Sequence, residues 1–205
     1  ALEKAQLKVQ RLIKKAIHQY KQEVTFTPMF PFAEGPREYQ KIAFENWKQN
    51  KQVGLFAMAT GTGKTITSLN CLLEVYKKTG YYKAVILVPT ITLVNQWENE
   101  CKRFRFNNIT KEYSKRPKWK SDIESLHLQE RIYGGEDKVS YVVIATYASF
   151  AKDGAFDLLN SLSSRAMLIA DEAHNLGSGG IRKKLPMIRY KRRIGLSATP
   201  DRQYD

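Results

Sequence analysis

The chain has 205 residues, 42% of them apolar, and its 34 lysines and arginines outnumber its 20 aspartates and glutamates, for a formal net charge of +14. It has no run of about 18 apolar residues and no apolar signal-peptide segment at its amino end, which argues against a membrane or secreted protein. We therefore expect a soluble, cytoplasmic protein without a membrane partner. The length suits one large α/β domain better than two small ones, and the charge favours polyanionic partners such as nucleic acid.

Residues 2–22 place apolar side chains three or four positions apart, which predicts an amphipathic helix. Its other face is rich in lysine and arginine, which is typical of a solvated surface but also suits phosphate contacts. The sequence starts within this helical pattern, so we expect a piece of a longer protein in which the helix is an accessory element or the end of an upstream module. We divide the sequence into 1–27, helix and linker, and 28–205, one domain.

Residues 24–35 contain two prolines and several phenylalanines, and they predict an extended connector that docks through its aromatic rings. Pro36 suits the first turn of a following helix. The buried face of that helix is marked by Tyr39, Ala43, Phe44 and Trp47.

A short apolar strand at 53–57 leads into the sequence ATGTGKT at 59–65, and apolar residues at helical spacing follow at 66–76. Gly61 and Gly63 allow the backbone to come close to a phosphate. Lys64 can bring a positive charge to the β and γ phosphates, and the Thr65 hydroxyl can bind magnesium. The helix amino end adds its free amides and its dipole.

This segment departs from the full Walker A pattern at Met58, which stands where the pattern has its first glycine. A chance Gly-Lys-Thr in a turn is the alternative, but the strand before it and the helix after it favour a phosphate loop. The loop residues Thr60 and Thr62 belong to the same predicted nucleotide site.

Further apolar runs predict strands at 84–88, 141–145, 166–170 and, more weakly, 193–196. Unbroken runs of this kind are typical of strands covered on both faces. Helical patterns at 93–104, 119–132 and 155–162 alternate with them, which predicts a doubly wound, mainly parallel sheet with helices on both faces. Cys71 and Cys101 fall in predicted helices without metal-ligand spacing, so we expect buried free thiols.

Ligands of such sheets bind beyond the carboxyl ends of the strands. Asp171 directly follows the run at 166–170, where a carboxylate can hold magnesium, and Glu172 could orient or deprotonate an attacking water. The alternative interpretation is that Asp171 and Glu172 only cap the turn that follows the strand. His174 could link this segment to Ser197 and its neighbours, or it could be a surface histidine.

The segments ATGTGKT, DEAH at 171–174, GLSATP at 195–200 and the Pro-Thr pair at 89–90 together resemble the first RecA-like domain of superfamily 2 helicases and translocases. Within that superfamily the sequence is most similar to the helicase subunits of type I and type III restriction enzymes. The resemblance covers residues 36–202. It implies a P-loop ATP hydrolase with ATP and magnesium as cofactors, Lys64 and Thr65 as phosphate and magnesium residues, and Asp171 and Glu172 as metal-binding and catalytic residues.

The same resemblance assigns roles outside the phosphate loop. It implies that Gln40, preceded by Arg37, contacts adenine. It implies that Pro89 and Thr90, together with Thr146 and Tyr147, grip the phosphodiester backbone of one strand. Ser197 and Thr199 would couple the nucleotide state to strand binding.

Superfamily 2 motors complete the ATP site with a second RecA-like domain, which this sequence lacks. We expect the chain by itself to bind ATP weakly. We also expect it to hydrolyse ATP more slowly than a motor with both domains, by a factor of about a thousand or more. The likeness to restriction-type translocases favours DNA over RNA as the partner. An RNA helicase and a nucleotide-gated binding module remain the alternatives. Basic stretches at 113–120 and 183–193 suit either strand binding or solvated surface.

Overall fold

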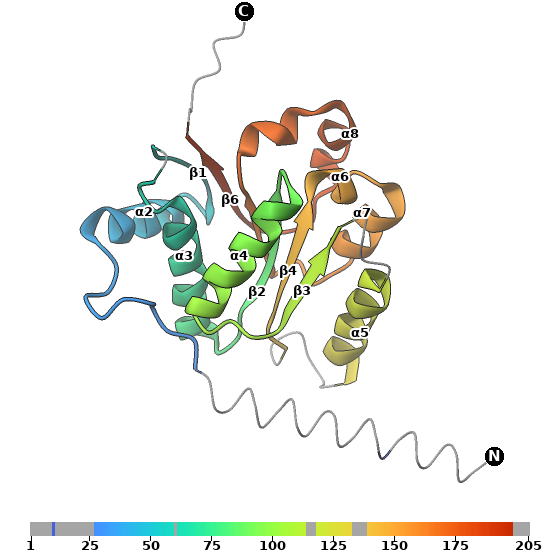
Figure 1. Ribbon diagram of the computed structural model, residues 1–205, viewed down its shortest axis with the longest axis horizontal. Helices are drawn as coiled ribbons and strands as arrows, with labels where there is room; N and C mark the ends of the chain where they lie inside the picture. Colours follow the sequence, from blue (N-terminus) through green and yellow to red (C-terminus); the bar gives the residue numbers. More distant parts are fainter. Residues whose placement is uncertain (1–9, 11–26, 60, 114–117, 133–138, 199–205) are drawn as a thin grey trace, which may run out of the picture.

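The described residues form one sheet of six parallel strands in the order β1-β6-β5-β2-β4-β3, shown in the computed structural model of Figure 1. The structure describes residue 10 and residues 27–59, 61–113, 118–132 and 139–198. The strands are β1 (Val53–Ala57), β2 (Lys83–Val88), β3 (Ile109–Glu112), β4 (Tyr141–Thr146), β5 (Met167–Ala170) and β6 (Arg192–Ser197). The predicted parallel sheet is therefore confirmed.

Helices cover both faces of this sheet. They are α2 (Glu38–Gln49), α3 (Lys64–Thr79), α4 (Ile91–Arg103), α5 (Trp119–Ile132), α6 (Tyr147–Phe150), α7 (Asp153–Asn160) and α8 (Gly179–Arg182), with the 3-10 helices η1 (Ala173–Gly177) and η2 (Leu185–Met187). The amphipathic helix predicted at 2–22 lies outside the described residues.

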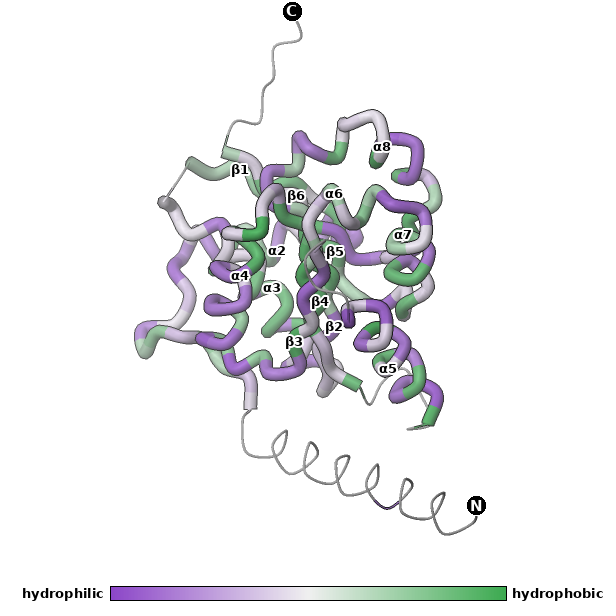
Figure 2. Tube along the Cα trace, turned by 45° about the vertical axis from the view of Figure 1, so that its right-hand side comes forward, coloured by the Kyte–Doolittle hydropathy of each residue, from purple (hydrophilic) through white to green (hydrophobic). Residues whose placement is uncertain are grey.

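The core has two layers, one on each side of the strands. Alternate residues of β2 point to opposite faces, so that Ile86 packs in the layer of α2, α3 and α4, whereas Leu87 packs in the layer of α5, α6 and α7. Figure 2 shows the hydrophobic strands at the centre, with hydrophilic residues on surrounding helices such as α4 and α5. Burial on both faces explains why the strands are unbroken apolar runs.

Three local predictions were wrong. Strand β3 was missed because it is a short edge strand with the sequence ITKE, in which buried residues alternate with half-buried ones. The four-residue helix α6 was also missed. Tyr39 is 39% exposed instead of lying on the buried face of α2.

Two further observations concern the helices. The predicted free thiols are confirmed, since Cys71 and Cys101 are both buried and unpaired. Among the residues that the structure describes, no helix is both long enough and apolar enough to cross a bilayer.

Strand β3 ends on a carboxylate buried inside the protein. Glu112 is 1% exposed, and neither of its carboxylate oxygens accepts a hydrogen bond from another described residue. Burial raises the pKa of Glu112 to about 7, and the nearby positive charge of Lys152 only partly opposes this shift. The folded protein therefore favours the protonated carboxyl group.

We expect Glu112 to make the protein less stable as the pH rises. The pKa of this group is higher in the folded chain than in the unfolded one, so its stabilising contribution is complete below about pH 4.5 and is lost as the pH rises through about 7. Glutamine stays neutral throughout. The quantity to measure is the unfolding free energy of Glu112→Gln minus that of wild type, obtained by urea unfolding at each pH. This difference should rise by about 3 kcal/mol between pH 4 and pH 8.

Glu124→Gln, which changes an exposed glutamate on α5, is the control for the exchange of carboxylate for amide. An unfolding free energy difference between Glu112→Gln and wild type that is the same at both pH values would contradict the prediction.

Candidate active site

All strands are parallel, so the segments that follow them meet at one edge of the sheet. The phosphate loop after β1 lies beside Ser197 at the end of β6, because Ala57 pairs with Ser197 and the Met58 amide donates to the Ser197 carbonyl at 3.0 Å. The Asp171 amide after β5 donates to the Leu87 carbonyl of β2 at 2.8 Å. Strand β2 in turn pairs with β4, which ends at Thr146. The predicted site segments therefore share one edge of the sheet.

The phosphate loop has the backbone that its glycines permit. Gly61 and Gly63 adopt left-handed conformations with φ of 80° and 87°, which other residues adopt only with strain. Helix α3 begins immediately after them at Lys64, so its free amides face the loop. The Lys64 ammonium donates to the Met58 carbonyl at 3.0 Å and so lies over the loop, and Thr65 stands in the first turn of α3. Thr60 lies outside the described residues.

Helix α2 packs against this loop through two consecutive residues. The Tyr39 hydroxyl donates to the Thr62 carbonyl at 2.7 Å. The buried amide of Gln40 accepts a hydrogen bond from the Arg37 amide at 2.9 Å and donates to the Thr67 hydroxyl at 3.4 Å. The structure thus brings Gln40 next to the phosphate loop and holds Arg37 to Gln40 through its amide, and the predicted contact of both with adenine stays a prediction.

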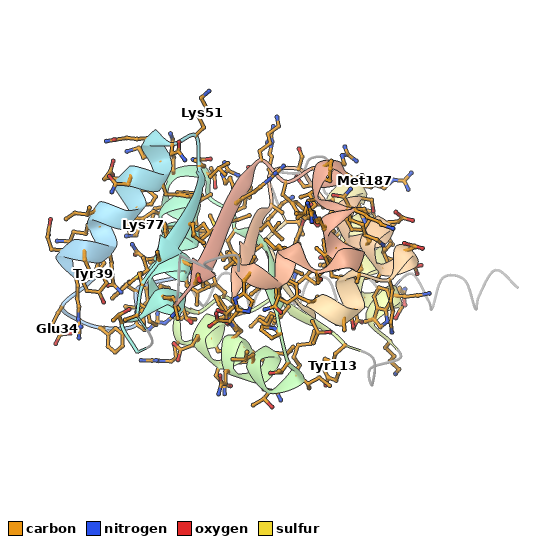
Figure 3. All side chains as sticks on the ribbon, turned by 90° about the horizontal axis from the view of Figure 1, so that it is seen from above. Glu34, Tyr39, Lys51, Lys77, Tyr113 and Met187 are labelled. Atoms are coloured by element: carbon orange, nitrogen blue, oxygen red, sulfur yellow. The ribbon has the colours of Figure 1, made fainter. Side chains whose placement is uncertain are left out.

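Sequence reasoning missed Tyr39 as a site residue. Its position between Arg37 and Gln40 was the available signal, but the helical pattern assigned it to the core. Figure 3 shows it on α2 at one end of the molecule, opposite Met187 at the other.

The acidic segment after β5 is held in an unusual backbone conformation. Glu172 has φ 48° and ψ 62°, a left-handed conformation that is uncommon for a residue with a side chain. Its carbonyl accepts two hydrogen bonds from Asn175, one from the amide and one from the side chain, each 2.9 Å long. Such strain is typical of functional sites. The Glu172 carboxylate is 35% exposed and lies 3.7 Å from the Nδ1 atom of His174.

The Asp171 carboxylate is buried and held by two donors. Its Oδ2 atom accepts the indole N–H of Trp97 at 2.9 Å, and its Oδ1 atom accepts the Glu172 amide at 3.0 Å. Each oxygen still has a lone pair for a cation. In the described part of the chain no three His, Cys, Asp or Glu side chains are grouped as a metal site. Magnesium does not require such a group, since one or two carboxylates and nucleotide phosphates commonly hold it, and Asp171 fits that donor set.

A glycine in β6 lets the acidic segment approach the strand that leads to the phosphate loop. A Cβ atom on Gly195 would lie 3.0 Å from Leu55 Cδ1 and 3.1 Å from Ala173 Cβ. Both distances are tighter than ordinary van der Waals contact. Ala173 and Leu55 can therefore pack over β6 only because residue 195 has no side chain.

The residues predicted to bind a nucleic-acid strand lie further along the same edge. Thr90 is exposed and caps α4 by accepting the Leu93 amide, and Thr146 caps α6 by accepting the Ser149 amide. Tyr147 has its side chain inside the protein, where its hydroxyl donates to the Asp171 carbonyl at 2.7 Å. Pro89 is half-buried, and Thr199 lies outside the described residues.

The basic stretch at 183–193 is partly engaged in internal contacts. Lys184 pairs with Asp153 at 2.5 Å, and Arg192 and Arg193 donate to backbone carbonyls. Lys183, Arg189 and Lys191 are exposed. Of the stretch at 113–120 only Tyr113 and residues 118–120 are described, and Lys120 lies 5.6 Å from the centre of the Trp119 ring.

Residues 34–202 match the family model for the res subunit of type III restriction enzymes. The chain belongs to this family. The match covers most of the chain and includes each of the strand ends described above. The likeness to restriction-enzyme helicase subunits predicted from the motifs is therefore confirmed.

The chain is also similar to proteins named as DNA translocases and helicases. The chain is 29% identical to the DNA 3'-5' translocase XPB2 of Sulfurisphaera tokodaii over 81% of its length, and 28% identical to a putative DNA 3'-5' helicase Rad25 of Haloarcula marismortui over 82%. It spans 31% and 23% of the lengths of these two relatives.

Two solved structures share the fold. A nuclease-deletion mutant of the type ISP restriction-modification enzyme LlaGI, in complex with a DNA substrate mimic, matches 82% of this chain and 18% of its own with a TM-score of 0.62 and 26% identity. The helicase domain of Pyrococcus furiosus Hef matches 86% of this chain and 35% of its own with a TM-score of 0.60 and 21% identity. The RecA-like fold expected from the sequence is thereby confirmed.

Proposed function

We propose that this chain is the ATP-binding motor domain of an ATP-dependent DNA helicase or translocase. Residues 28–205 would form the first of two RecA-like domains, and residues 1–27 an accessory helix and linker. One observation carries the proposal: the phosphate loop, Ser197, the acidic segment and the starts of α4 and α6 lie along one edge of the sheet. Nucleotide and nucleic acid would then bind to neighbouring segments of a single edge.

The residues around the phosphate loop suit a bound triphosphate. Gly61, Gly63 and the first amides of α3 would bind the phosphates, and Lys64 would pair with the β and γ phosphates. Gln40 stands next to the loop and is bonded to the Arg37 amide, which supports the assignment of this pair to adenine. Asp171 and Thr65 would hold magnesium, whose charge offsets that of the phosphates when it is bound.

The acidic segment suits hydrolysis of that triphosphate. Glu172 would orient the attacking water and accept its proton, and its partial exposure leaves it accessible to water. Ser197 is linked through its carbonyl to the Met58 amide of the phosphate loop, which supports a coupling role for 197–199 together with His174.

The proposed binding of a nucleic-acid strand rests on the segments that follow β2 and β4 at the same edge of the sheet. The amino end of the 13-residue helix α4 suits phosphodiester groups, and Thr90 and Thr146 cap the starts of α4 and α6. Pro89 and the backbone of Tyr147 adjoin them. The net charge of +14 favours a polyanion. The printed names of the relatives, and the DNA complex of the LlaGI mutant, favour DNA over RNA.

A second RecA-like domain would complete this site. Closure of two such domains around ATP and their reopening after hydrolysis would move the bound strand. Arginines from the second domain would stabilise the charge that develops on the γ phosphate, which is worth a factor on the order of a thousand or more in turnover. We expect this chain alone to hydrolyse ATP more slowly by that factor.

The test compares ATP turnover by the full-length protein without nucleic acid and with single-stranded DNA, duplex DNA and single-stranded RNA of equal length. We expect one of the two DNA forms to give the highest turnover. Highest turnover with RNA would indicate an RNA helicase instead. Nucleotide-dependent binding of DNA without turnover would indicate a nucleotide-gated module, and brisk DNA-stimulated turnover by this chain alone would contradict the need for a second domain.

A further inference from the structure

Two aromatic side chains from different helices hold Asp171. The indole N–H of Trp97, on α4, donates to the carboxylate at 2.9 Å, and the hydroxyl of Tyr147, on α6, donates to the backbone carbonyl at 2.7 Å. All three residues are buried, with Trp97 only 2% exposed. Water therefore offers these groups no ready alternative partner, and each hydrogen bond is costly to break.

Both helices begin at segments that the proposed function assigns to the nucleic-acid strand. Helix α4 starts after its cap Thr90, and α6 starts after its cap Thr146. Helix α4 is anchored to the core around Trp97 by Val94 and Cys101, which are fully buried. A displacement at the start of either helix would therefore be transmitted to Asp171 through a packed, hydrogen-bonded side chain.

The chemistry of the two donors suits the task of fixing a carboxylate. An indole N–H only donates, so Trp97 orients the carboxylate without competing for a cation. The Tyr147 hydroxyl donates to the backbone carbonyl of Asp171, so it does not occupy the carboxylate oxygens either. Groups behind a metal ligand typically set its orientation, and their loss costs about 10- to 100-fold in metal affinity or activity.

We propose that Trp97 and Tyr147 are positioning residues that orient Asp171 for magnesium and tie its position to the starts of α4 and α6. The proposal rests on the proposed function, since it takes Asp171 as the magnesium ligand of the ATP site. Any effect of strand binding on the affinity for magnesium nucleotide must then be matched by an equal effect of magnesium nucleotide on the affinity for the strand.

The test uses Trp97→Phe and Tyr147→Phe, which remove the donors but keep aromatic rings in the core. The chain offers a matched control for each. Trp47 is also 2% exposed and donates its indole N–H to the Arg193 carbonyl at 3.0 Å, and Tyr190 is buried and donates its hydroxyl to the Leu159 carbonyl. Trp47→Phe and Tyr190→Phe therefore lose hydrogen bonds of the same kind that do not involve Asp171.

The first measurement is binding of a fluorescent ATP analogue to each variant of the chain as magnesium is titrated. We expect the half-saturating magnesium concentration to rise about 10-fold in Trp97→Phe and by a smaller factor in Tyr147→Phe, with nucleotide binding in the absence of magnesium unchanged. Trp47→Phe and Tyr190→Phe should match wild type, although all four variants lose some stability.

The second measurement follows the indole N–H resonances of the three tryptophans by NMR. Magnesium nucleotide should shift the Trp97 resonance, identified by its loss in Trp97→Phe, and single-stranded DNA should shift it as well. The Trp47 resonance should stay in place.

Equal magnesium dependence in the Trp97→Phe, Tyr147→Phe and control variants would overturn the positioning role while leaving the proposed function intact. If Trp97→Phe does not fold, Tyr147→Phe and the wild-type resonance still decide the question. Failure of the wild-type chain to bind the nucleotide with magnesium would overturn the proposed function itself, and the positioning role with it.

Discussion

Replacing Glu172 by glutamine is expected to lower ATP turnover by about a hundred- to ten-thousand-fold, the range found for loss of a general base. Glutamine has the same shape but cannot accept a proton from the attacking water. The left-handed backbone at residue 172 is held by the two hydrogen bonds from Asn175 to its carbonyl, which the substitution leaves intact. Nucleotide binding should therefore be retained. The measurement is phosphate release by the full-length protein with DNA, alongside binding of a fluorescent ATP analogue.

Glu74→Gln is the matched control for this substitution. Glu74 is an α3 glutamate whose side chain is 28% exposed, close to the 35% of Glu172, and it pairs with Lys77 at the end of the helix remote from the phosphate loop. A loss of less than about tenfold in Glu172→Gln would remove Glu172 as the base. That result would favour a nucleotide-gated module, which does not need the carboxylate.

Replacing Lys64 by alanine is expected to weaken ATP binding by roughly 10- to 150-fold, since a hydrogen bond to a charged group is worth about 1.5–3 kcal/mol. The Lys64 ammonium lies over the loop, 3.0 Å from the Met58 carbonyl, at the amino end of α3. The variant would remove from the loop the one positively charged side chain that is proposed to reach the phosphates. Equilibrium titration of the chain with a fluorescent ATP analogue measures the effect, and the melting temperature reports whether the fold is kept.

Lys77→Ala provides the comparison, because Lys77 lies in the last turn of the same helix and is exposed and paired with Glu74. We expect its affinity for the nucleotide to match wild type. Equal affinity in Lys64→Ala and wild type would mean that the glycine loop does not receive the phosphates, and the proposed motor function would fail with it.

The elements that a short stretch of sequence specifies by itself were predictable. Burial on both faces makes each central strand an unbroken apolar run, and the phosphate loop is marked by glycines at the two positions that need a left-handed backbone. Edge strand β3 escaped prediction because three of its four residues are polar and its two buried positions are Thr110 and Glu112, so ITKE lacks the apolar pattern of a strand. Tyr39 was assigned to the core because helical spacing does not tell a core contact from one with a neighbouring loop.

The sequence alone thus indicated which segments can hold a phosphate, a cation and a water. Each of these roles depends on a few particular residues that lie close together in the sequence. Tertiary structure alone specified which segments meet. Strand order decides that β6 lies between β1 and β5, and that Trp97 reaches Asp171, 74 residues away. Such contacts depend on how helices pack over the parallel strands of an open sheet, and no local period in the chain encodes that packing.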